Sequence, residues 1–72
     1  MSNLEKLTDK EKEIELMQTI NETKQMLKIA ISNFEYAEDD LIDYYTYQIK
    51  ANQAKLDYLL KITYNFAGEN RF

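Results

Sequence analysis

The chain has 72 residues and a net charge of −4, and it contains neither Cys nor His. A domain of this size buries only about 60% of its unfolded surface, so it usually needs disulfides, a metal or a second chain for stability. The missing Cys and His exclude disulfides and the common zinc sites, which leaves association with another chain as the expected device. The acidic balance argues against nucleic acid as a partner, because its phosphates are bound through Lys and Arg.

The composition indicates a single all-α domain over residues 1–72, because Pro is absent, Gly occurs once and no strand-like runs alternate with turn residues. The N-terminus lacks the apolar run of a signal peptide, and no stretch of about 18 apolar residues occurs. We therefore expect a cytoplasmic protein without membrane association. We also expect no enzymatic activity, no cofactor and no metal site, since the residues offer no nucleophile with its base and no ligand cluster.

The first predicted helix covers residues 9–37 and follows a segment, residues 1–8, that is expected to fray. Thr8 and Glu11 have the spacing of a capping box, which marks the start of this helix. Apolar and small residues then recur alternately at steps of four and three, as in the seam of one helix against another. These residues are Leu16, Ile20, Thr23, Leu27, Ala30, Phe34 and Ala37, with Met17 and Ile31 widening the seam on one side and Met26 and Ile29 on the other.

An acidic run at residues 38–40 is predicted to form a turn, because negative charge stabilises the start of a helix and destabilises its end. Asp40 is predicted to cap a second helix at residues 41–67. Gly68 is predicted to end that helix in a left-handed conformation, before a loose tail at residues 68–72. Since neither Pro nor Gly interrupts the chain near the acidic run, one continuous helix is the alternative.

The phase of the apolar residues favours an antiparallel hairpin over a continuous helix. Continuing the first seam would place Lys55 in the core, whereas a series one residue out of phase is more apolar. The resulting hairpin seam consists of Leu16, Ile20, Leu27, Phe34, Ile42, Tyr45, Ile49, Leu56 and Leu59. Asn52 falls within the same series, where it either fixes the register of the helices or is tolerated at the edge of the seam.

The second predicted helix carries another apolar series, again at steps of three and four. Its members are Tyr44, Tyr47, Ala51, Ala54, Tyr58 and Ile62. One helix cannot bury two faces against one short partner, and exposed Tyr combines large contact area with a polar tip. The series is therefore predicted to be an interaction surface.

The expected function is a small protein-interaction or regulatory module with a cytoplasmic protein as its partner. The hairpin itself is expected to dimerise into a four-helix bundle. The alternative function is a self-assembling structural homodimer with no separate partner.

Several short strings resemble the YaaL-like family of spore-forming and related Gram-positive bacteria. They are NFEY at residues 33–36, LIDY at residues 41–44 with Tyr47 three positions later, Ala51, and the segment 55–60. The resemblance implies a small, soluble, helical cytoplasmic protein without an assigned enzymatic activity, and it supplies no catalytic residues. The chain departs from the family pattern at Asp39, where Pro is common, and at residues 55–56, where an Arg-aromatic pair is common.

Overall fold

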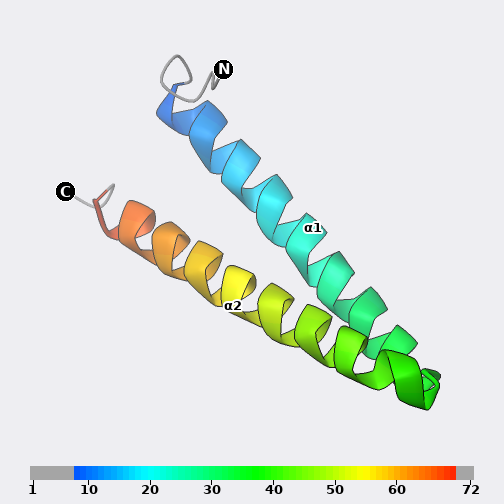
Figure 1. Cartoon of the computed structure of the whole chain (residues 1–72). Helices are drawn as coiled ribbons and strands as arrows, with labels where there is room; N and C mark the ends of the chain where they lie inside the picture. The colour runs from blue at the N-terminus through cyan, green and yellow to red at the C-terminus, as the bar shows by residue number, and fades with distance from the viewer. Residues whose placement is uncertain (1–7, 70–72) are drawn as a thin grey trace, which may run out of the picture.

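The chain folds as a hairpin of two helices in the computed structural model, which describes residues 8–69 and the side chains of residues 8–65 (Figure 1). Helix α1 spans Asp9–Glu35 and helix α2 spans Asp39–Glu69. The helices run antiparallel and diverge from their connection toward the two termini (Figure 1). The predicted all-α hairpin is confirmed, and a single continuous helix is excluded.

The start of α1 is fixed by the predicted capping box, which is confirmed. The backbone N–H of Glu11 donates to Oγ1 of Thr8 at 3.1 Å, and the backbone N–H of Thr8 donates to Oε1 of Glu11 at 3.1 Å. Both bonds satisfy donors that the first turn of a helix leaves without partners. The bond from the Thr8 backbone also lowers the pKa of Glu11, because it favours the charged carboxylate.

The connection between the helices lies at residues 36–38, earlier than the predicted turn at residues 38–40. The N–H of Tyr36 donates to the carbonyl of Asn33, and the N–H of Ala37 donates to the carbonyl of Phe34. These short-range bonds tighten the last turn of α1, so the helix ends at Glu35 rather than at residue 37.

Helix α2 begins at Asp39, which corrects the predicted capping role of Asp40. Asp39 and Asp40 both lie in the first turn of the helix, and the N–H of Leu41 donates to the carbonyl of Glu38 at 2.8 Å. The two carboxylates still lie near the positive end of the helix dipole, where negative charge is favourable. The acidic run therefore supports the start of α2 from within its first turn.

The predicted end of the second helix at Gly68 is also wrong, because α2 continues through this residue to Glu69. No glycine of the described chain has a positive φ. A Gly within a helix costs about 1 kcal/mol relative to Ala, and the helical hydrogen bonds on either side can offset that cost. The rest of the predicted frayed segment, residues 1–7, and of the predicted loose tail, residues 70–72, lies outside the described residues.

The core is a narrow seam between the two helices. Its buried side chains are Ile20, Thr23 and Ala30 from α1 and Asn52 and Leu59 from α2. Ala30 and Tyr45 lie at one level of the hairpin, and Leu16 and Leu59 lie at another, since each pair lines the same groove. Ala30 and Leu16 each lie seven residues from Thr23 in α1, and Tyr45 and Leu59 each lie seven residues from Asn52 in α2. This register therefore brings Thr23 opposite Asn52.

The two buried polar side chains satisfy their donors within their own helices. Oγ1 of Thr23 donates to the carbonyl of Thr19 at 2.8 Å, and Nδ2 of Asn52 donates to the carbonyl of Gln48 at 2.9 Å. No buried side-chain nitrogen or oxygen in the described part of the chain lacks a hydrogen-bond partner. The middle of the seam can therefore hold polar residues without the cost of an unpaired buried group.

The hairpin is a single layer of helices. Its principal dimensions are 50 × 27 × 14 Å, and the smallest is close to the diameter of one helix with its side chains, about 10–12 Å. The radius of gyration is 15.7 Å, against about 11 Å expected for a compact domain of this length. Both broad sides of the layer are consequently open.

Candidate functional site

The residues predicted to form the hairpin seam divide by their burial. Those that are buried or half-buried are Leu16, Ile20, Leu27, Tyr45, Ile49, Leu56 and Leu59. Phe34 and Ile42, in contrast, are 39% and 36% exposed. Both lie beside the connection, where the chain reverses and no further helical turn follows to cover them. Their assignment to the seam is therefore corrected.

The six residues of the second apolar series, here called the Tyr face, lie along one side of α2. They are Tyr44, Tyr47, Ala51, Ala54, Tyr58 and Ile62. Their spacing of three and four residues aligns them on a helix, and the three Tyr side chains are 54%, 69% and 64% exposed in chain order. The two Ala residues are exposed and Ile62 is half-buried. Most of this apolar and aromatic surface is thus left uncovered by α1.

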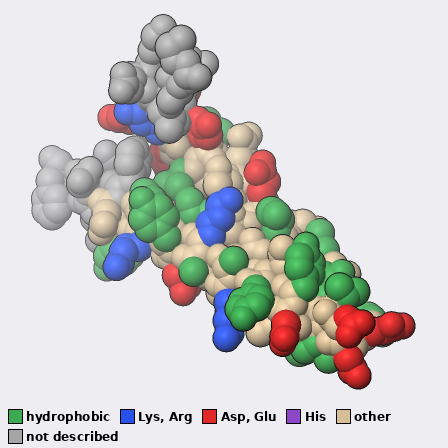
Figure 2. Space-filling model, viewed as in Figure 1, with side chains coloured by type: hydrophobic (Ala, Val, Ile, Leu, Met, Phe, Trp, Pro, Cys, Tyr) green, Lys and Arg blue, Asp and Glu red, His purple; other side chains and the backbone are tan. Residues whose placement is uncertain are grey.

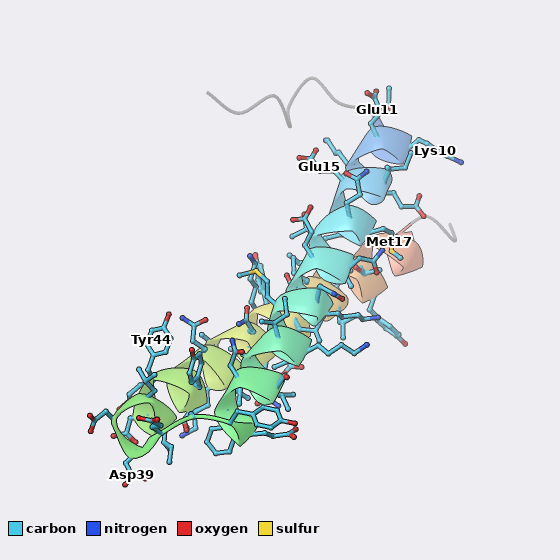
Figure 3. The ribbon with its side chains drawn as sticks, turned by 90° about the vertical axis from the view of Figure 1, so that its right-hand side faces the viewer. Lys10, Glu11, Glu15, Met17, Asp39 and Tyr44 are labelled. Atoms are coloured by element: carbon cyan, nitrogen blue, oxygen red, sulfur yellow. The ribbon has the colours of Figure 1, made fainter. Side chains whose placement is uncertain are left out.

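Tyr44, at the start of the Tyr face, lies on one broad side of the hairpin. In Figure 3, Tyr44 and Glu15 project from the same side of the layer, while Met17 and Lys10 project from the opposite side. The side that carries Tyr44 faces the viewer in Figure 2, where hydrophobic side chains extend along the molecule with charged side chains between them. This side of the molecule therefore combines hydrophobic side chains along its length with charged side chains among them.

A groove near the closed end of the hairpin extends this surface onto α1. It has a volume of about 280 Å³ and is lined by Met26, Ile29, Ala30, Asn33, Tyr44, Tyr45 and Gln48. Met26 and Ile29 are each 52% exposed, although sequence reasoning assigned them only to the flank of the seam. Each of them precedes a seam residue by one position, and this spacing was the sequence signal that placed them beside the seam. The structure adds that they lie beside Tyr44.

Tyr44 is held in place by its neighbours in α2. Its ring lies edge-on to the ring of Tyr45, with 5.0 Å between the centroids and 74° between the planes. Its hydroxyl accepts a hydrogen bond from Nε2 of Gln48 at 3.2 Å. Because both contacts come from the same helix, this exposed ring has its orientation set before any partner arrives.

A second groove, of about 360 Å³, opens where the helices diverge. It is lined by Lys12, Glu13, Glu15, Leu16, Thr19, Leu59 and Ile62. The widening leaves Leu16 and Ile62 only half-buried, although the first was predicted in the seam and the second in the interaction surface. The Tyr face is thus continuous with an apolar opening into the seam at this end.

The opposite side of the hairpin carries a smaller set of exposed aliphatic residues, here called the aliphatic face. Its members are Met17, Ile31, Ile42 and Leu60. Ile42 and Leu60 lie about five helical turns apart, on the side of α2 away from the Tyr face. The sequence pattern did not predict this face, because its α1 residues read as a widening of the seam and Ile42 read as a seam residue.

The acidic residues at the connection do not form a ligand set for a metal. Glu38, Asp39 and Asp40 line a shallow hollow at the turn. Within the described chain, no group of three Asp or Glu side chains is arranged to hold a metal ion. Over the same residues, neither helix is long and apolar enough to cross a membrane.

The fold and the exposed surface define a small helical-hairpin protein with an uncovered aromatic face. Residues 2–63 match a family described as "Protein of unknown function (DUF2508)", and this range contains every residue of the Tyr face. The chain belongs to the DUF2508 family. No curated protein and no solved structure matches it.

Proposed function

We propose that this chain is a cytoplasmic protein-interaction or regulatory module that binds its partner through the Tyr face. The observation that carries the proposal is the 69% and 64% exposure of Tyr47 and Tyr58 on a helix whose other side is packed against α1. Large aromatic side chains are costly to leave in water, and they are enriched in the buried centres of protein interfaces.

The rigid support of this face favours binding. Side chains that are ordered before association lose less conformational entropy when the partner arrives. Tyr44 has its ring orientation set by Tyr45 and Gln48, and the helix beneath it is anchored by Asn52 and Leu59 in the seam. A Tyr side chain also has few rotatable bonds for its contact area, which further limits the entropy that ordering costs.

The chemistry of the surface supports contact rather than catalysis. The groove beside the Tyr face is lined mainly by Met, Ile, Ala and Tyr with two amide side chains. These groups supply apolar area and neutral hydrogen bonds, whereas general acid–base catalysis needs titratable groups held in a confined site. The proposal therefore includes no enzymatic activity and no cofactor. With a net charge of −4, it also includes neither nucleic acid nor a membrane as partner.

The short strings NFEY and LIDY support a finer assignment within the family. On this resemblance we propose that the chain is a YaaL-like protein of the cytoplasm of a Gram-positive bacterium. The alternative function is a structural homodimer that consumes the Tyr face. It is favoured by the same exposed residues, because a symmetric partner would cover them equally well.

Site-specific photo-crosslinking in the native host tests the proposed function. A photoreactive phenylalanine analogue at position 47 should crosslink to protein several-fold more than the same analogue at position 53. Gln53 is the matched control, because it is exposed on the same helix and lies outside the Tyr face. Equal crosslinking at both positions would contradict a binding role for this face.

A further inference from the structure

We infer that the Tyr face binds a second copy of this chain, with α2 of one copy running antiparallel to α2 of the other about a two-fold axis. The inference rests on the proposed binding role of the Tyr face, and it takes the second copy, named above in the alternative function, as the partner of that surface. In a two-fold interface each residue pair occurs twice, so the surface must be complementary to itself. The Tyr face can be tested against that requirement residue by residue.

The order of side-chain sizes along the Tyr face is the same in both directions. Tyr47, Ala51, Ala54 and Tyr58 follow one another at steps of four, three and four, so the order is large, small, small, large. If two copies of α2 pair antiparallel about the midpoint of this sequence, Tyr47 of one copy meets Tyr58 of the other. The small Ala51 then meets Ala54 where the helices cross. Their short side chains allow close approach at the centre, and the Tyr rings pack on either side.

Charges on one edge of the Tyr face fit the same antiparallel pairing. Asp43, Lys50, Asp57 and Lys61 are all exposed and lie on one edge of α2, with alternating sign along the chain. The antiparallel arrangement brings Lys50 of one copy near Asp57 of the other. It also brings Asp43 near Lys61, and the two-fold axis makes each pair occur twice. A parallel two-fold arrangement would instead place this edge on opposite sides of the interface in the two copies, so these charges would not meet.

The exposed area of the hairpin is sufficient for such a dimer. The chain exposes 6259 Å², against about 4,700 Å² expected for a compact monomer of 8.6 kDa. A stable interface of standard size covers about 800 Å² on each partner. The excess is larger than that amount, so the chain has enough uncovered surface for an interface of standard size. The stacked hairpins would form a four-helix bundle.

Sedimentation equilibrium of the full chain across micromolar concentrations tests the inference, with helical content followed by circular dichroism. The wild type should sediment at twice the 8.6 kDa mass of one chain. Lys50→Glu should raise the dimer dissociation constant about tenfold, because two attractive pairs become repulsive. Adding Asp57→Lys to that variant swaps both signs and should restore affinity toward the wild-type value.

Lys28→Glu is the matched control for the charge reversal. Lys28 is exposed on α1, about five helical turns from Lys10 and hence on the side of the hairpin opposite Tyr44 (Figure 3). The Lys28→Glu substitution changes the net charge by the same amount as Lys50→Glu. It should leave the dimer dissociation constant within about twofold of the wild type. An equal loss of affinity in both variants would overturn the proposed pairing.

Two further results would overturn the inference. The first is a monomeric wild type at every concentration. The second is a dimer that withstands Lys50→Glu but dissociates in Leu60→Lys, which would move the interface to the aliphatic face. The crosslinking at position 47 separates these failures from failure of the proposed function. A monomer that crosslinks there to a different protein keeps the function and removes the second copy as partner, whereas crosslinking no stronger than at position 53 removes both.

Discussion

The two sides of α2 have similar apolar spacing but opposite environments. The inner side includes Asn52 and Leu59, each 8% exposed, while the Tyr face includes Tyr47 and Tyr58, which are 69% and 64% exposed. The buried side contains the more polar residue and the exposed side the more aromatic ones. In a single-layer hairpin, therefore, burial is decided by which side meets α1. Apolar character alone does not decide it.

The largest expected difference is in the free energy of unfolding, between a truncation in the seam and a truncation on the Tyr face. Ile20, which is 2% exposed, packs in the seam, and Ile20→Ala should lower the free energy of unfolding by about 3 kcal/mol because it leaves a cavity. Tyr47→Ala should change it by less than about 0.5 kcal/mol in the monomer. Urea denaturation at concentrations where the chain is monomeric measures both values. Equal losses would mean that the Tyr face contributes to the fold of the single hairpin.

Replacing the buried amide of Asn52 tests how a polar residue on the inner side of α2 affects stability. Asn52→Leu should raise the free energy of unfolding by about 1 kcal/mol, because it buries more apolar area and removes only a bond to the carbonyl of Gln48 within the same helix. Gln53→Leu is the exposed control and should have little effect. A loss of stability in Asn52→Leu during thermal denaturation would show that Asn52 fixes the register of the helices.

The smallest expected effect lies at the start of α1, away from both sides of α2. The pKa of Glu11 is lowered in the folded chain, so the stability that its carboxylate contributes is complete above the unfolded pKa, near the ordinary value of 4.5. This stability is lost as the pH falls through the lower folded pKa. The protection of amides in the first turn of α1, taken as the exchange rate relative to the intrinsic rate at each pH, should fall over that acidic range in the wild type. In Glu11→Gln this pH dependence of protection should be absent. A similar fall in protection in the variant would assign it to another group.

Local pattern was sufficient to predict much of the hairpin. The capping box needs only the spacing of Thr8 and Glu11, because its hydrogen bonds form within one turn. The phase shift between the two apolar series indicated the chain reversal, since one helix cannot keep both series on a single side. The same spacing predicted a second apolar side on α2, and its three Tyr residues are exposed.

Other features depended on how the two helices meet in space. The exposure of Phe34 and Ile42 follows from the position of the connection, and the aliphatic face follows from a layer only one helix thick. The grooves arise from the divergence and close approach of two segments distant in sequence. The sequence by itself therefore determined the two helices, the cap at the start of α1 and the apolar series on each helix, because these depend on neighbours within a turn or two. Only the tertiary structure decided which of those sides is covered, because covering requires contact between the two helices.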